Sequence, residues 1–213
     1  MAEGFSPKWR RRKDARPSEI VAAALACFAE RGFAATRLDD IAERAGVTRG
    51  TLYLYFDSKE ELFKAVVRQS IGSVLSRVAE RAESAALPSP ELLRQVVLAI
   101  PQAVLGTPAS ALPKLVVAEA TNFPEIAHFY LNEVVHPAKG LIARILERGI
   151  ARGEFRAVDI EQTVMCVIGP ILLTALWRHS LEPFDTAPTD AIGVARTHVD
   201  LLLYGLSSAG GRS

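Results

Sequence analysis

Cysteine and aromatic residues are scarce in this 213-residue sequence. The two cysteines, Cys27 and Cys166, lie far apart and next to apolar residues, so they cannot form a metal cluster by themselves and do not indicate a secreted disulfide scaffold. Aromatic residues make up only 7%, while alanine and leucine are abundant, which favours helices. With 49% hydrophobic and 23% charged residues, the composition is that of a globular protein rather than of a disordered or fibrous chain.

Long apolar runs are also lacking. Residues 163–177 carry no charge, but these 15 residues fall short of the roughly 20 that a bilayer span requires. The uncharged stretch at residues 95–113 contains three prolines. We therefore predict no membrane span and no membrane partner. Residues 1–16 include a basic stretch with no apolar segment behind it, so we predict no signal peptide and a cytoplasmic location.

The sequence lacks the common catalytic motifs. It has no Gly-X-Ser-X-Gly turn, no phosphate-binding loop and no His-Glu-X-X-His run. His128 and His136 lie on one expected helix with Glu133 nearby, so a metal site is conceivable, although two surface histidines are the more common outcome. We predict no enzymatic activity, no cofactor and no metal.

Positive charge is concentrated at the amino end, although the net charge is only +1. Residues 1–68 hold 13 Lys and Arg against 10 Asp and Glu, whereas residues 69–213 hold 12 against 14. Most of the excess lies in one short stretch, at Lys8, Arg10, Arg11, Arg12, Lys13 and Arg16. Such a stretch indicates a polyanionic partner, and a merely solvated tail is equally compatible with the composition. We predict a flexible basic arm over residues 1–16.

Apolar spacing predicts an all-α protein with a helix-turn-helix near its amino end. A helix is expected at residues 17–32, where Pro17 suits the first turn and Gly32 ends it. Thr36 opens a short second helix that ends at Gly46. The next segment, residues 47–56, contains the strand-like TLYLYF, but the tight turn before it favours a helix.

The rest of the chain is expected to be helical as well, and no segment alternates like a strand. One helix is predicted from about Ser58 to about Ala86. Further helices are predicted at about 89–105, 111–121, 124–152, 159–181 and 188–207. The predicted organisation is a helix-turn-helix domain at residues 17–63 followed by a larger helical domain at 64–213.

The expected start of the third helix carries side chains suited to DNA. A recognition helix presents its first turns to base edges in the major groove. Arg49 could fork onto a guanine edge, and Gly50 would permit close approach to the duplex. The other polar groups here could reach bases or phosphates, and they belong to Thr48, Thr51, Tyr53, Tyr55 and Lys59. Taken singly, each could instead be an ordinary surface or packing residue.

The ordered pattern resembles the amino-terminal DNA-binding domain of the tetracycline-repressor (TetR) family of bacterial regulators. The resemblance covers residues 17–63 and is carried by the run GFAATRLDDIAERAGVTRGTLYLYFDSKEELF. The matching positions are Thr36, Ile41, Ala42, Ala45, Gly46, Val47, Gly50, Thr51, Tyr53, Tyr55, Phe56 and Lys59.

The resemblance implies specific DNA contacts and one departure. It gives contact roles to Thr36, Arg49, Thr51, Tyr53, Tyr55 and Lys59. Family members often have a basic residue where this chain has Asp39, an acid that would repel phosphate, and Arg37 could compensate as a further contact. The basic arm would lie beside the duplex.

The resemblance also implies a homodimer through the last two long helices and a ligand cavity in the second domain. Residues 164–177 are apolar nearly all round and could pack with residues 197–206 in a four-helix bundle, although both could instead be internal core. Kinks at Pro101, Pro137 and Pro170 could open a cavity, or these prolines could mark helix ends. Candidate lining residues, each of which could equally be ordinary packing, are Phe123, His128, Phe129, Tyr130, Met165 and Trp177.

These expectations describe a ligand-responsive transcriptional regulator, a repressor that leaves a pseudo-palindromic DNA operator when a small, apolar or aromatic effector binds. One alternative is a dimeric DNA-binding protein with no sensor role, and another is an enzyme built on the helical half.

Overall fold

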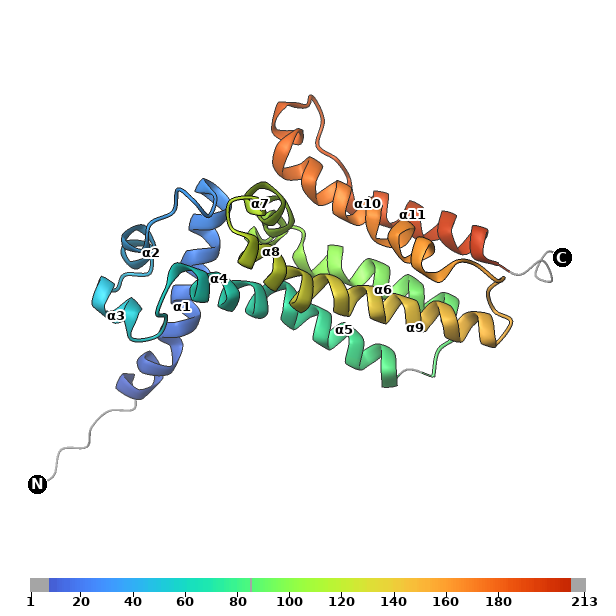
Figure 1. The fold of residues 1–213 in the computed structure, drawn as a ribbon, viewed down its shortest axis with the longest axis horizontal. Coiled ribbons are helices and arrows are strands. Elements are labelled where there is room, and N and C mark those ends of the chain that lie inside the picture. Colours follow the sequence, from blue (N-terminus) through green and yellow to red (C-terminus); the bar gives the residue numbers. More distant parts are fainter. Residues whose placement is uncertain (1–7, 85, 208–213) are drawn as a thin grey trace, which may run out of the picture. The chain divides into compact units, whose positions relative to one another are not determined.

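The structure, a computed structural model, describes residues 8–84 and 86–207, and within these ranges it contains helices and no β-strand (Figure 1). An isolated antiparallel bridge joins Phe155 to Ser207. The all-α prediction is confirmed. The chain divides between Gln69 and Ser70 into two compact units, which are described separately below as the first unit and the second unit. The boundary predicted from the sequence lay six residues earlier, after residue 63.

The first unit contains α1 (Lys8–Arg31), α2 (Leu38–Arg44), α3 (Arg49–Tyr53) and α4 (Lys59–Val67). Its core is built on three phenylalanines, Phe28, Phe33 and Phe63, each no more than 1% exposed. Their ring centroids lie 5.4–5.9 Å apart in tilted and edge-to-face arrangements, which are favourable for aromatic rings. This cluster links α1, the segment after it and α4.

Local signals set the ends of these short helices. The Thr48 hydroxyl accepts a hydrogen bond from the Thr51 backbone N–H at 3.2 Å, and the Ser58 hydroxyl accepts one from Glu61 at 3.1 Å. Each cap satisfies a donor that the first helical turn would otherwise leave unpaired. Gly32 and Gly46 follow α1 and α2 with φ of 81° and 65°, a conformation that residues with a side chain rarely adopt.

Several boundaries in this unit differ from those expected, and α3 spans Arg49–Tyr53 rather than residues 47–56. The structure begins α1 at Lys8, so residues 8–16, predicted as part of a flexible arm, are helical; residues 1–7 lie outside the described residues. Lysine and arginine are good helix formers, which accounts for the extension. The cap of α2 is Arg37 rather than Thr36, and the Asp40 carboxylate accepts the Arg37 N–H at 3.1 Å. The hydroxyl of Thr36 bonds to carbonyl oxygens behind it instead.

The second unit begins inside η1 (Arg68–Gly72), a π-helical turn between α4 and α5 (Ser73–Ser84). It continues through shorter and longer helices: α6 (Ser89–Val104), η2 (Pro108–Ala111), α7 (Leu112–Glu119), α8 (Pro124–Tyr130), η3 (Leu131–Val135), α9 (His136–Ala151), α10 (Ile160–Ser180), η4 (Glu182–Phe184) and α11 (Ala191–Leu206). Helix α6 packs against α5, α9 and α11, and α10 packs against α7, α9 and α11 (Figure 1). The core between them is aliphatic apart from Phe155.

Two helices predicted as continuous are interrupted by π turns. One is η1, within the helix expected from Ser58 to Ala86, and the other is η3, within the helix expected at 124–152. Pro137 explains the second, because it cannot donate to the carbonyl four residues earlier and its ring crowds that carbonyl. A wider i to i+5 turn before the proline relieves this conflict.

Gly149 gives α9 the space to pack against the segment that follows it. The Phe155 ring is 3% exposed and lies so close to Gly149 that a Cβ at this position would overlap it. The Arg156 backbone N–H then donates to Leu206 O at 3.0 Å, next to the bridge between Phe155 and Ser207. The end of α9 is thereby tied to the end of α11.

Helix α10 is longer than its uncharged run and is poorly covered within one chain. It has 21 residues, and its most apolar 18-residue window has a mean hydropathy of 1.6. Only 11% of this window is buried within the chain. By length and composition alone it could cross a membrane, and so could α6 together with η2 and α7, if this pair, bent by 107°, is counted as one span. Core helices of soluble proteins meet the same criterion. The absence of a membrane span therefore stays a prediction.

Candidate nucleic-acid interface and effector cavity

Helix α3 exposes polar groups on one edge and buries Leu52 on the other. Leu52 is fully buried, and Thr51 and Tyr55 are half-buried. The exposed residues at this edge, four of them predicted DNA contacts, are Thr48, Arg49, Gly50, Tyr53 and Leu54. Burial of Leu52 orients the helix, and the Thr48 cap fixes its start, so the exposed edge is presented in a defined orientation.

The Arg49 side chain is held from two sides. Its Nη1 donates to both carboxylate oxygens of Asp39, at 3.2 and 3.1 Å, and its Nη2 donates to the Tyr53 hydroxyl at 3.2 Å. The guanidinium carbon also lies 5.6 Å from the Tyr53 ring centroid, within cation–π range. The hydrogen bond to Tyr53 and the negative charge of Asp39 raise the pKa of Arg49. Asp39, expected from the sequence to repel phosphate, is thus the partner of Arg49 in the absence of DNA.

Gly50 needs no special space in the free protein. A Cβ added to it would have only the Thr48 hydroxyl oxygen nearby, at 3.9 Å, which is an ordinary contact. Glycine inside a helix is unfavourable relative to alanine. The fold alone therefore does not explain why glycine stands at this position.

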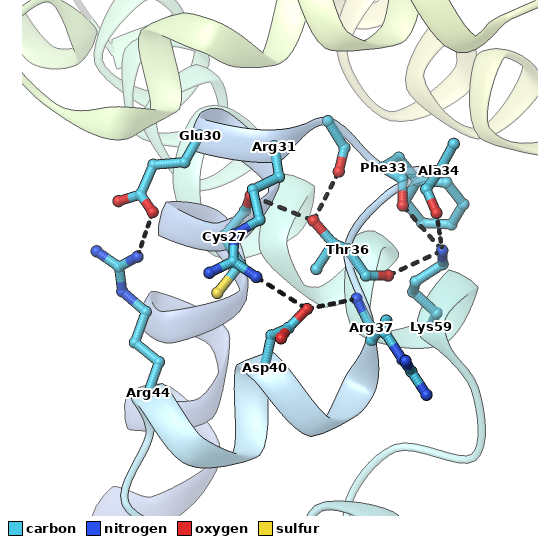
Figure 2. A network of polar contacts seen from close by, with 11 residues as sticks. Cys27, Glu30, Arg31, Phe33, Ala34, Thr36, Arg37, Asp40, Arg44 and Lys59 are labelled. Carbon is cyan, nitrogen blue, oxygen red and sulfur yellow. Dashed lines mark hydrogen bonds and ion pairs between the residues drawn. The ribbon is translucent and has the colours of Figure 1, made fainter.

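Lys59 points inward, toward the segment between α1 and α2 (Figure 2). Its ammonium donates to the carbonyl oxygens of Phe33 at 2.8 Å, Ala34 at 3.3 Å and Thr36 at 3.1 Å, and it lies 4.4 Å from the Phe33 ring centroid. Three acceptors saturate the three hydrogens of an ammonium group. The geometry accounts for Lys59 as a residue that holds this turn, and its predicted phosphate contact stays a prediction.

Thr36 is buried, whereas Arg37 is exposed. The Thr36 hydroxyl lies 2.6 Å from Gly32 O and 3.2 Å from Cys27 O, so it closes the carboxyl end of α1 (Figure 2). The structure therefore does not bring Thr36 to the edge that carries Arg49. Its predicted DNA contact is untested, as is that of Arg37.

Ion pairs between α1 and α2 surround this turn. Arg44 bonds to Glu30 at 2.6 Å, and Arg31 bonds to Asp40 at 3.0 Å (Figure 2). The hydrogen bond from Arg44 lowers the pKa of Glu30, and the hydrogen bond from the Arg37 N–H lowers the pKa of Asp40. Three of the four side chains are exposed and Asp40 is half-buried, so the pairs add little to stability and chiefly fix the register of the two helices.

The second unit contains a cavity of about 250 Å³. Most of its lining side chains come from α6, α9, α10 and α11, and Ile71 of the π turn η1 also lines it. Of the six candidate residues, Tyr130 and Met165 line it, whereas Phe123, His128, Phe129 and Trp177 are not among its lining residues. Pro101 and Pro170, two of the prolines expected to kink helices, also line it.

Few polar groups face this cavity, and most are already bonded to the protein. The hydroxyl of Ser110 donates to Thr107 O at 2.8 Å, that of Thr174 donates to Pro170 O at 2.7 Å, and the His198 Nε2 lies 3.0 Å from Val167 O. Burial raises the pKa of Tyr130 well above its usual range. Lys139, the one charged residue of the lining, makes no hydrogen bond or ion pair through its ammonium among the described residues. Lys139 was not among the lining residues predicted from the sequence. The only signal that could have indicated it was a lysine among apolar positions of a helix.

Comparisons with known proteins agree with this architecture. Residues 20–66 match the family model described as bacterial regulatory proteins, tetR family, and residues 91–193 match the tetracyclin repressor-like C-terminal domain. The HTH-type transcriptional repressor KstR2 of Rhodococcus jostii is 28% identical over 92% of this chain and 93% of its own length. The chain belongs to the TetR family.

Solved structures of TetR proteins have the same fold. The ketosteroid transcriptional regulator KstR2 of Mycobacterium tuberculosis superimposes with a TM-score of 0.71 at 25% identity, over 91% of this chain and 95% of that one. The transcriptional regulator FadR of Bacillus subtilis, solved with stearoyl-CoA, gives 0.70 at 24% identity over 89% and 98%. As a TetR protein, the chain is a DNA-binding transcriptional regulator that responds to a small molecule, and its family consists of regulators rather than enzymes.

This TetR chain leaves an apolar surface uncovered on α10 and α11. Large apolar side chains are exposed there at Met165, Leu172, Leu173, Val194, Leu201 and Tyr204. Leu173 is 64% exposed and Tyr204 76%. Single exposed apolar residues are ordinary, but a group on two packed helices is typical of an interface.

Proposed function

We propose that the protein is a homodimeric repressor whose two α3 helices bind the half-sites of a pseudo-palindromic operator. The observation that carries this proposal is the exposed edge of α3, where Arg49 is held by Asp39 and Tyr53 above the buried Leu52. A fixed guanidinium can donate two hydrogen bonds to the O6 and N7 atoms of guanine. Thr48, Gly50 and Thr51 are proposed to contact bases or backbone beside it, and Tyr53 and Tyr55 to reach phosphates.

Selection of bound fragments from random duplex DNA tests this proposal. We expect an inverted repeat whose half-site centres are about 34–36 Å apart, or a multiple of that distance. Arg49→Ala should remove the preference at one base pair in each half-site and cost about 1–3 kcal/mol of binding free energy. Recovery of no preferred sequence would contradict the proposed reading by α3.

The dimer is proposed to form through α10 and α11. Pairing these helices with those of a second chain would cover the exposed apolar surface and build a four-helix bundle. Leu173→Glu should convert the dimer to a monomer in sedimentation experiments, because it places a charge on this surface. Val117→Glu is the matched control, since Val117 is similarly exposed, at 59% against 64%, but lies on α7. A dimer that survives Leu173→Glu would exclude this face.

The cavity of the second unit is proposed to bind a mainly apolar effector with one anionic group. Its volume of about 250 Å³ is near the lower end of ligand pockets, and its lining is aliphatic apart from the few polar groups described above. One structural relative is a ketosteroid transcriptional regulator, and ketosteroids are molecules with large apolar parts. Lys139 supports the anionic group, because its ammonium has no partner among the described residues.

Decanoate and decanol form a matched pair of probes for this charge. We expect decanoate to bind the wild-type protein more tightly than decanol does, and Lys139→Met to abolish the difference while leaving decanol binding unchanged. Calorimetric titration measures both. If decanol binds and the charge makes no difference, the cavity remains a ligand site and only the role of Lys139 is wrong.

Effector binding is proposed to act on DNA through the π turn η1. This turn contains the boundary between the two units, and its Ile71 is 4% exposed and lines the cavity. A ligand that moves Ile71 would alter a π turn, which is less regular than the α-helices on either side. To release the operator, the effector must bind the released state more tightly than the DNA-bound state, by about 1–3 kcal/mol for typical coupling.

We further propose that the protein acts in the cytoplasm and catalyses no reaction, as its relationship to bacterial regulators supports. The alternative, a dimeric DNA-binding protein without a sensor, predicts that ligands of the cavity leave operator affinity unchanged. Titrating decanoate into the protein–operator complex distinguishes the two.

A further inference from the structure

We infer that Asp39 is a positioning residue that sets the base specificity of Arg49 and, at the same time, weakens binding to non-specific DNA. This inference rests on the proposed reading of DNA by α3. Asp39 lies in the first turn of α2, ten residues before Arg49, so the pair joins the two helices of the helix-turn-helix.

The geometry restricts Arg49 to one orientation. Asp39 accepts from Nη1 with both oxygens, and the Tyr53 hydroxyl accepts from Nη2. The guanidinium cannot rotate without breaking contacts on both sides. Arginine has five N–H donors, so donors remain for a guanine edge while these contacts persist.

Stability of the free protein does not explain the pair. The side chains of Arg49 and Asp39 are 56% and 47% exposed, and ion pairs at such positions contribute little to folding. Fixing a flexible arginine before it meets DNA, however, removes conformational entropy that would otherwise be lost on binding. The benefit of the pair therefore arises when Arg49 contacts a base.

The charge of Asp39 has the opposite effect on non-specific binding. Attraction between basic side chains and phosphates provides most of the affinity for any duplex. A carboxylate beside Arg49 cancels part of that attraction, and it also disfavours a swing of Arg49 toward the backbone. Asp39 thus lowers affinity for every duplex while orienting Arg49 toward the base that it reads, and both effects raise the ratio of specific to non-specific affinity.

Glu43 provides a matched control on the same helix. It is exposed, and its carboxylate makes no hydrogen bond or ion pair among the described residues. Asp40 is unsuitable, because it bonds to Arg31 and to the Arg37 N–H. Glu43→Ala therefore removes the same charge as Asp39→Ala without changing the support of Arg49.

The experiment measures the affinity of full-length variants for a duplex selected by the wild-type protein and for a shuffled duplex of equal length. We expect Asp39→Ala to bind the shuffled duplex several-fold more tightly and to lose roughly tenfold of its selectivity, at the same base pair that Arg49→Ala relaxes. Glu43→Ala should tighten binding to both duplexes equally. Asp39→Glu should restore most of the selectivity, because it retains the carboxylate.

The double variant with Asp39→Ala and Arg49→Ala decides whether Asp39 acts through Arg49. We expect its selectivity to equal that of Arg49→Ala alone. An Asp39→Ala protein that keeps the wild-type preference at the base pair read by Arg49 would overturn the inference. The inference would also be overturned if Asp39→Ala reduced selectivity equally in the wild-type protein and in the Arg49→Ala protein. If the wild-type protein selects no sequence at all, the proposed DNA reading fails together with the inference, whereas the other outcomes leave that reading intact.

Discussion

Replacing Gly50 with alanine should separate the stability of the first unit from its affinity for DNA. In the free protein the new methyl group would have only the Thr48 hydroxyl oxygen within 4 Å, at 3.9 Å, so nothing must move. Alanine is favoured over glycine in a helix by about 0.5–1 kcal/mol. For a domain of this size, 1 kcal/mol raises the melting temperature by about 4–8 °C. We therefore expect Gly50→Ala to melt a few degrees higher than the wild-type protein.

The same methyl group should weaken binding to DNA. If the backbone at Gly50 approaches the duplex closely, an added methyl must displace α3 or the DNA, and overpacking of this kind costs about 1–3 kcal/mol. A loss of 1.4 kcal/mol is tenfold in the dissociation constant. Circular dichroism measures the melting temperature, and fluorescence anisotropy with a selected duplex measures the affinity.

Gly140→Ala is the control for this experiment. Gly140 lies in α9 of the second unit, and its added Cβ would meet Arg144 Nη1 at 3.6 Å, again an ordinary contact. It should raise the melting temperature without changing DNA affinity. A Gly50→Ala protein that is more stable and binds the duplex as the wild type does would refute the reasoning that the backbone at this position approaches DNA.

Three further predictions concern one residue of the first unit and two of the second. Lys59→Met should lower the melting temperature of the first unit, because three carbonyl oxygens lose their donor. Lys59→Arg should not restore this melting temperature fully, because a planar guanidinium does not match three converging acceptors. Thermal melts check both variants. Gly149→Ala should destabilise the second unit by about 1–3 kcal/mol in urea unfolding, because its methyl would overlap the buried Phe155 ring, and an unchanged midpoint would contradict this packing. Burial lowers the pKa of His179 below its ordinary value of 6.5, with Arg178 and Lys114 acting in the same direction and Glu182 opposing them. The unfolded chain therefore binds more protons than the folded one as the pH falls through 6.5, so stability should decline there, and a smaller decline in His179→Gln would confirm the source.

Signals within the sequence were enough to predict the class of fold and the position of the helix-turn-helix. Hydrophobic spacing, Ser58 ahead of α4, and the glycines at 32 and 46 are local signals, because each acts within one or two helical turns. The tight turn after Gly46 also indicated that TLYLYF, residues 51–56, is not a strand, although only its first three residues belong to α3. Positions of π turns could not be predicted in this way, since hydrophobic spacing does not distinguish a π turn from an α-helix over five residues.

The directions in which the polar side chains of that motif point depend on how the helices pack. Lys59 and Phe33 are 26 residues apart, and only the packing of α4 against α1 brings the ammonium to three carbonyl oxygens. Asp39 became a partner of Arg49 rather than an isolated acid for the same reason, because α2 and α3 are in contact. The cavity likewise depends on which faces of several helices meet, and that choice depends on packing over the whole second unit. Residue type and spacing along the chain carry no information about such contacts between distant elements until the helices have packed together.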